Sequence, residues 1–149
     1  MIRRYAQTDL EGAAEVFRAA FAGEPWNEDW SYELAARRIS ELMSAPQSAG
    51  YVNEENGVIT AILCGRVLHY LSGAEYVIDE FCVSPSSQRQ GTGTAVIEYA
   101  ASELKAEGVA AMALMTARGF PSEKFYLRNG FEGNDGMVFM YRSIKGECK

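Results

Sequence analysis

The sequence has little of what a metalloprotein, a secreted protein or a nucleic-acid-binding protein needs. It has one histidine, His69, and three scattered cysteines, Cys64, Cys82 and Cys148, without Cys-x-x-Cys spacing. We therefore expect free thiols and no metal site. Basic runs are missing and the formal net charge is −6, which argues against nucleic acid or an anionic membrane as a partner. Because no apolar run approaches the ~20 residues of a membrane span and no signal peptide is evident, we expect a cytoplasmic protein.

The hydrophobic pattern indicates one α/β domain over residues 1–149. Nearly half of the residues, 48%, are hydrophobic, and no repeat or linker-like stretch interrupts them. The expected order is βααβββαβαββ, which predicts a mixed sheet. The predicted helices cover residues 8–21, 31–43, 94–107 and 122–128. The predicted strands cover residues 2–6, 50–53, 57–69, 76–83 and 109–116, followed by a final hairpin at 131 and 137–141 around Asn134-Asp135-Gly136.

The most informative segment joins the strand at 76–83 to the helix that follows it. Two glycines, Gly91 and Gly93, stand at the start of that helix. Glycine lets the backbone approach an anion closely, and the first amides of a helix have no intrahelical acceptor. Together with the helix dipole, these amides predict a phosphate site that needs no basic side chain. The third glycine of a dinucleotide fingerprint is missing, because position 96 is valine.

Two motifs resemble those of the GCN5-related N-acetyltransferases (GNAT). Gln88-x-x-Gly91-x-Gly93 is similar to the family's pyrophosphate loop, and Phe125-Tyr126-x-x-x-Gly130-Phe131 is similar to a later family segment. The resemblance spans about residues 1 to 143 and implies that the chain binds acetyl-CoA as co-substrate. Gly119 stands where the family often has an asparagine that contacts the pantetheine arm. The implied cofactor-binding residues are Phe81, Cys82, Val83, Gln88, Arg89, Gln90, Gly91, Thr92, Gly93 and Thr94. The strand ending in the first three of these is expected to splay from its neighbour and expose its amides.

Two residues are candidates for proton transfer. Glu80 lies mid-strand, and strict alternation would place Tyr76, Ile78, Glu80 and Cys82 on one face. An acid in an apolar sheet is costly to bury ionised, so we expect a raised pKa and a role as general base, with Asp79 or a water as alternatives. The resemblance implies that Tyr126 protonates the departing thiolate. His69 is expected to be structural, and Cys82 has no identifiable base to activate it as a nucleophile.

The acceptor site is expected between the first two helices. Trp26, Glu28, Asp29 and Trp30 combine aromatic faces with carboxylates, which suit an ammonium ligand, although they would equally fit a surface loop. The resemblance predicts transfer of an acetyl group to a primary amine of a small molecule or peptide, by direct attack in a ternary complex. The alternative is a non-catalytic acyl-CoA-binding sensor or scaffold. A homodimer is possible, because many family members dimerise.

Overall fold

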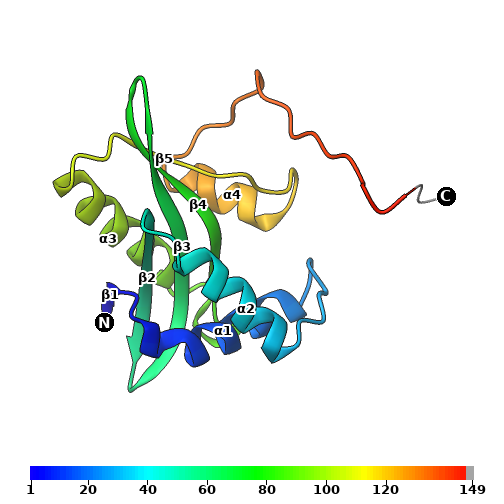
Figure 1. Ribbon diagram of the computed structural model, residues 1–149. Helices are drawn as coiled ribbons and strands as arrows, with labels where there is room; N and C mark the ends of the chain where they lie inside the picture. Colours follow the sequence, from blue (N-terminus) through cyan, green and yellow to red (C-terminus); the bar gives the residue numbers. More distant parts are fainter. Residues whose placement is uncertain (147–149) are drawn as a thin grey trace.

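A five-stranded sheet runs through the molecule in the order β1-β2-β3-β4-β5, as the computed structural model of residues 1–146 shows (Figure 1). The first four strands pair antiparallel, whereas β5 lies parallel to β4. This arrangement confirms the predicted mixed α/β fold. The strands are β1 (Ile2–Arg4), β2 (Ser48–Glu55), β3 (Val58–Tyr70), β4 (Gly73–Val83) and β5 (Ala111–Ala113).

Helices cover both faces of the sheet and divide the core in two (Figure 1). On one face, α1 (Leu10–Ala22) and α2 (Tyr32–Met43) bury Phe17 and Ile39 against β2 and β3. On the other face, α3 (Thr92–Ala106) buries Val96 and Leu104 in a second cluster. The last helix, α4 (Pro121–Arg128), packs Phe125 beside that second cluster. None of the helices within residues 1–146 is long and apolar enough to cross a membrane.

Local signals in the sequence account for several boundaries. Ser31 caps α2 by accepting a hydrogen bond from the Leu34 amide at 3.1 Å. Asn56 and Gly57 both have positive φ, 51° and 78°, as a tight hairpin between β2 and β3 requires. These two predictions, the cap and the hairpin, are confirmed.

A β-bulge in β4 changes which side chains face each helix layer. Cys64 of β3 pairs with Glu80, but the next residue, Gly65, pairs with Ile78, so Asp79 is an extra residue in β4. Tyr76 and Ile78 therefore belong to the α3 cluster, whereas Cys82 belongs to the α1–α2 cluster. The prediction that Tyr76, Ile78, Glu80 and Cys82 share one face was wrong, because the bulge reverses the alternation after residue 78.

Strands β4 and β5 separate halfway along β4. Their pairing covers only Glu75 with Ala111, Tyr76 with Met112 and Val77 with Ala113. Beyond Val77, β4 keeps its partner on the β3 side alone. The expected splay of the strand that ends in Phe81, Cys82 and Val83 is therefore present.

The end of the chain differs from the sequence-based expectation. The predicted buried strand over 109–116 forms only over Ala111–Ala113, at the edge of the sheet. The predicted hairpin at 131 and 137–141 is also wrong, because those residues form no strand and their side chains at 137–141 are exposed. Without an outer neighbour for β5, neither segment acquires the partner that a buried strand needs. Cys148 lies outside the described residues.

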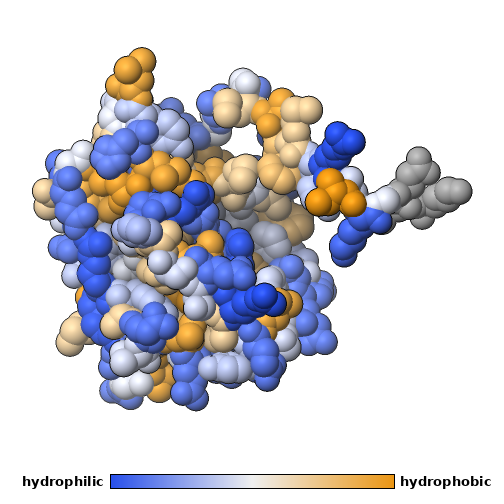
Figure 2. Space-filling model, viewed as in Figure 1, coloured by the Kyte–Doolittle hydropathy of each residue, from blue (hydrophilic) through white to orange (hydrophobic). Residues whose placement is uncertain are grey.

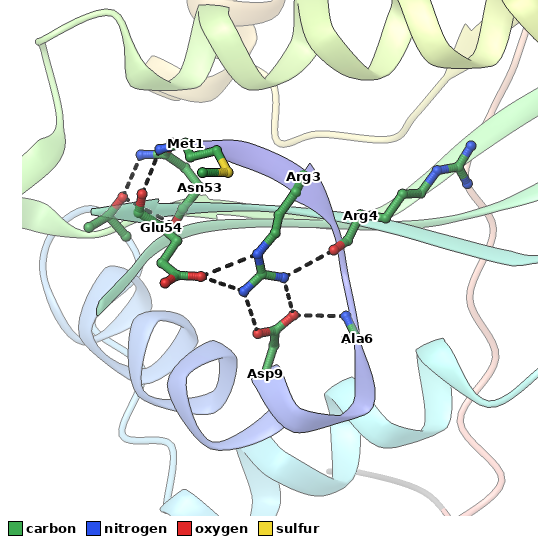
Figure 3. A network of polar contacts seen from close by, with 8 residues as sticks. Met1, Arg3, Arg4, Ala6, Asp9, Asn53 and Glu54 are labelled. Atoms are coloured by element: carbon green, nitrogen blue, oxygen red, sulfur yellow. Dashed lines mark hydrogen bonds and ion pairs between the residues drawn. The ribbon is translucent and has the colours of Figure 1, made fainter. Parts of the chain in front are cut away.

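Arg3 ties the first strand to the start of α1 and to β2 (Figure 3). Its guanidinium donates to both carboxylate oxygens of Asp9, at 2.8 and 2.9 Å, and also to the Glu54 carboxylate. Asp9 is buried and also accepts from the Ala6 amide at 2.8 Å. The hydrogen bonds from Arg3 lower the pKa of Asp9 below its ordinary value.

Replacing Asp9 with asparagine should destabilise the fold. Asp9→Asn removes a charge-assisted pair from a buried position, and the expected cost is about 1–3 kcal/mol at neutral pH. Because the folded-state pKa is depressed, this contribution is complete above the unfolded pKa of ~3.9 and is lost as pH falls through the folded pKa. Urea unfolding at several pH values should show wild type and variant converging in acid. Asp29→Asn, at an exposed site, is the matched control. If the loss of stability in Asp9→Asn does not depend on pH, the proposed link between the lowered pKa of Asp9 and stability is wrong.

Candidate active site

A cleft of about 1030 Å³ opens where β4 separates from β5. Its walls are the end of β4, the loop before α3, helix α4, the segment after β5 and the loop between α1 and α2. Most of the predicted site residues line this one cleft. They are Trp26, Glu28, Trp30, Glu80, Phe81, Cys82, Val83, Gln88, Arg89, Gly91, Gly93, Thr94 and Tyr126. Asp29, Gln90 and Thr92 do not line it.

The first turn of α3, beside the cleft, has unpaired backbone amides. Gly91 is the N-cap of the helix, with φ of 82°, and accepts the first helical hydrogen bond from Ala95 at 2.9 Å. The amides of Thr92, Gly93 and Thr94 therefore have no acceptor within the helix, and no side chain caps it. This end of α3 has the partial positive charge and free donors that suit a phosphate.

Three further features fix the shape of the loop before α3. A Cβ atom at Gly93 would lie 3.1 Å from the Phe125 ring, so glycine lets α4 pack against the start of α3. Arg89 has a positive φ of 61°, which is unusual for a residue with a side chain. The Gln88 side-chain amide donates to the Val83 carbonyl at 2.9 Å and ties the loop to the end of β4.

Glu80 lies on the α1–α2 side of the sheet, in contact with Arg38. The Arg38 guanidinium donates to Oε1 of Glu80 through Nη2 at 3.1 Å and Nε at 3.3 Å. The Glu80 side chain is only 19% exposed. Burial raises the pKa of Glu80 above its ordinary value, although the hydrogen bonds from Arg38 oppose the shift; the charge of Glu28 adds to the rise. Sequence analysis missed Arg38, because it lies on α2, 42 residues from Glu80.

Tyr126 lies in α4 against an aromatic cluster. Its ring centroid is 5.4 Å from Phe131 and 6.5 Å from Phe81. Burial raises the pKa of its hydroxyl well above the ordinary value, with smaller contributions from Cys82 and Glu80. The phenol therefore stays protonated at neutral pH. Within residues 1–146 its hydroxyl makes no hydrogen bond, whereas the hydroxyl of Tyr76 donates to the Ala49 carbonyl at 2.7 Å.

Three other candidate groups are less suited to catalysis, although Asp79 and Cys82 also line the cleft. Asp79, the extra residue of β4, accepts from Arg66 Nε at 2.8 Å and Nη2 at 3.0 Å. Cys82 is a buried thiol whose pKa burial raises well above its ordinary value, so it is a poor nucleophile. His69 is exposed and lies outside the cleft. The described residues hold no group of three or more His, Cys, Asp or Glu side chains placed to bind a metal ion.

The loop between α1 and α2 forms the far end of the cleft. Trp30 packs edge-on against Phe17, with ring centroids 4.7 Å apart, and Trp26 lies between Phe21 and Phe120. Glu24 and Glu28 line the same region. The sequence did not single out Glu24, Phe21 or Phe120, because their place beside the cleft depends on α4 approaching this loop from a distant part of the chain.

Comparison with known proteins identifies the family. Residues 10–131 match the acetyltransferase (GNAT) family. Because the match covers most of the chain, the chain belongs to the GNAT family of acetyltransferases. This confirms the prediction of an acetyltransferase enzyme. No curated protein matches the chain significantly.

Solved structures share the fold over nearly the whole chain. A possible acetyltransferase from Clostridium difficile 630 has a TM-score of 0.81 at 15% identity, covering 97% of each chain. The aminoglycoside N-acetyltransferase AAC(6')-Iy, bound to a bisubstrate analogue, has a TM-score of 0.72 at 21% identity, covering 96% of this chain and 97% of that one. An aminoglycoside acetyltransferase from an uncultured soil metagenomic sample, bound to sisomicin, reaches 0.74 at 18% identity, covering 97% and 96%. At these identities the likeness establishes the fold.

Proposed function

We propose that the chain is a cytoplasmic enzyme that transfers an acetyl group from acetyl-CoA to a primary amine of a small cationic molecule, by direct attack in a ternary complex. Residues 1–149 act as one catalytic domain in this proposal. The observation that carries it is the convergence of three groups on one cleft: the free amides at the start of α3, the buried carboxylate of Glu80 and the unpaired hydroxyl of Tyr126.

The residues at one end of the cleft fit acetyl-CoA. The amides of Thr92, Gly93 and Thr94 would hold the pyrophosphate, since a helix start offers several donors to one anion. The pantetheine arm would lie along β4 from Val83 toward Phe81, where the splay leaves the strand without a neighbour on the β5 side. Gly119, in place of the family's asparagine, offers no side chain to that arm. Bound there, acetyl-CoA supplies the activated acetyl group.

The other end of the cleft suits an ammonium group. Glu24, Glu28 and Glu80 supply negative charge, and Trp26 and Trp30 supply aromatic faces that attract cations. The structural neighbour bound to sisomicin supports an acceptor that carries several amines. An aminoglycoside-like or polyamine-like molecule therefore fits better than an isolated neutral amine.

The two candidate residues would handle protons on either side of the transfer. Glu80 would accept the proton that an alkylammonium must lose before its nitrogen can attack, directly or through one water. Backbone amides of β4 would stabilise negative charge on the thioester oxygen. The Tyr126 hydroxyl, kept protonated by burial, would donate to the departing sulfur.

Acetyl-CoA should stabilise the wild-type fold through the glycine loop. At a hundred times its dissociation constant, a ligand adds about 2.7 kcal/mol to the free energy of unfolding. Gly91→Leu should remove most of this gain, because a side chain at the N-cap obstructs approach to the amides. Gly108→Leu is the matched control: Gly108 lies just after the other end of α3, and its φ of 85° imposes the same strain. Thermal unfolding of the two variants, with and without acetyl-CoA, measures how much the ligand stabilises each. An equal stabilisation of Gly91→Leu and Gly108→Leu would contradict the proposal that this loop binds acetyl-CoA.

Tyr126→Phe should reduce turnover while leaving affinity for acetyl-CoA nearly unchanged. The substitution keeps the ring's packing and deletes only the proton donor, so kcat should fall within the ~10²–10⁴-fold typical of general acid catalysis. Tyr99→Phe, at a half-buried tyrosine outside the cleft, should leave kcat unchanged. An unaltered kcat in Tyr126→Phe, with the chemical step rate-limiting, would leave Tyr126 with a packing role only.

The decisive test of the proposed reaction compares wild type and Glu80→Gln on a panel of amines. The release of CoA thiol measures the rate of acetyl transfer. Wild type should acetylate at least one polycationic amine, with a rate that rises with pH as Glu80 ionises. Glu80→Gln should be slower by ~10²–10⁴-fold at neutral pH and recover part of that loss at high pH, where the free amine is already populated. Glu75→Gln, on the same strand but outside the cleft, should match wild type. If wild type acetylates no amine of the panel, the proposed reaction is wrong. If Glu80→Gln acetylates at the wild-type rate, the general base is Asp79 or a water and not Glu80.

A further inference from the structure

The ion pair between Arg38 and Glu80 involves only one oxygen of the carboxylate. Arg38 donates to Oε1 of Glu80 through Nη2, at 3.1 Å, and through Nε, at 3.3 Å. Within residues 1–146, Oε2 accepts no hydrogen bond. It is also not one of the buried polar side-chain atoms without a partner, which are the hydroxyls of Tyr5 and Tyr51, so solvent reaches it. One oxygen of Glu80 is therefore held, and the other is free to accept a proton.

Arg38 reaches this carboxylate from outside the cleft. Glu80 lines the cleft, whereas Arg38 does not. Two neighbours of Arg38 on α2, Ala35 and Ile39, are fully buried in the core cluster between the helices and the sheet. Their packing fixes the place from which the arginine side chain extends. Arg38 can therefore support Glu80 and still leave the cleft open for an acceptor.

The arginine next to Arg38 behaves differently. Figure 2 shows mainly hydrophilic residues over α1 and α2. Arg37 belongs to such a surface: its side chain is 75% exposed and pairs at 3.3 Å with Glu41 of the same helix, which is 62% exposed. Exposed pairs of this kind contribute little to stability. Arg38 instead reaches across to β4, so the two adjacent arginines form a natural pair of test and control positions.

Arg38 supplies the positive charge beside Glu80 in the described part of the chain. The other ionisable groups around this carboxylate are acidic or neutral. They are Glu28 from the loop between α1 and α2, Asp79 and Cys82 from β4, Cys64 from β3 and Tyr126 from α4. Asp79 has its own partner, Arg66, at 2.8 Å. The ionised form of Glu80 therefore depends on Arg38 for an opposite charge.

We propose that Arg38 is a positioning residue for acetyl transfer, which holds Oε1 of Glu80 so that Oε2 faces the ammonium group of the acceptor. This inference rests on the proposed role of Glu80 as general base. A base acts only within hydrogen-bond reach of the proton that it takes, about 2.6–3.2 Å. A planar guanidinium with two donors orients a carboxylate better than a point charge does. Arg38 thus has two effects, on the direction of the carboxylate and on its ionisation, and substitutions can separate them.

Three variants of α2 separate these two effects. Arg38→Met removes both, so kcat at neutral pH should fall roughly 10–100-fold. The acid limb of kcat/KM should also move to higher pH by about one unit, because Glu80 ionises less readily without its partner. Arg38→Lys keeps the charge but loses the two-donor contact, so its kcat should fall while its acid limb stays near that of wild type. Arg37→Met is the matched control and should leave both unchanged. Wild-type kcat and acid limb in Arg38→Met would overturn the proposal.

A double variant shows whether Arg38 acts through Glu80. If it does, adding Arg38→Met to Glu80→Gln should leave kcat at the level of Glu80→Gln alone. The double variant carries no unpaired carboxylate at position 80, so it keeps the test available should Arg38→Met alone fail to fold. A further fall of about 10-fold or more would give Arg38 a structural role and overturn the proposal, with Glu80 still the base. Wild-type kcat in Glu80→Gln would instead reject Glu80 as the base and, with it, the role of Arg38.

Titration of Glu80 by NMR tests the contact without an acceptor amine. In protein labelled with ¹³C at the glutamate side-chain carboxyls, the signal of Glu80 is the one that Glu80→Gln lacks. The pKa of Glu80 should be higher in Arg38→Met than in wild type by about one unit, and Arg37→Met should match wild type. This result is expected whichever amine the enzyme acetylates. An equal pKa in wild type and Arg38→Met would show that Arg38 does not hold the carboxylate, and the proposal would be wrong.

Discussion

The placement of chemical groups in the cleft depends on one extra residue in β4. If Asp79 paired regularly with β3 and formed no bulge, continuous alternation would turn Glu80 toward α3, on the side of Ile78, and away from Arg38. The bulge is held in place by the paired hydrogen bonds from Arg66 to Asp79. The Tyr76 ring lies against the opposing Gly65, where a Cβ atom would be 2.4 Å from Tyr76 Cζ. A β-bulge changes the direction of nearby side chains and gives up regular pairing in the ladder. Here it turns the side chain of Glu80 toward Arg38 on the α1–α2 side of the sheet.

Glu80 shows how burial and pairing balance within this framework. Desolvation disfavours the carboxylate, whereas Arg38 favours it, and the outcome is a pKa raised only in part. Arg38 comes from α2, and its own side chain is 40% exposed. The Arg38 guanidinium is therefore partly solvated and also paired with Glu80. Such a group can change partners without leaving an unpaired ion in the interior of the protein.

Local signals in the sequence predicted most of the fold and the loop, and long-range contacts determined the rest. Glycines before an amphipathic helix, Ser31 as a cap and the Asn56-Gly57 turn each act over a few residues, so the sequence displays them. The bulge depends on the register between β3 and β4, which no single segment reveals. Arg38 reaches Glu80 only after α2 packs on the sheet. The apolar run at 137–141 has a strand's pattern, but a strand also needs a neighbour, and within residues 1–146 this segment pairs with none.

The start of α3 also bears on how this protein can change over evolutionary time. Its free donors are main-chain amides, which every residue except proline provides. Substitutions there are restricted chiefly by backbone conformation, at Gly91, and by the close approach of Phe125, at Gly93. At Thr92 and Thr94 the main-chain donors do not depend on which side chain stands there. Anion-binding sites of this type can persist after most of their side chains have been replaced, and identities as low as the 15–21% seen among the structural neighbours are compatible with that kind of divergence.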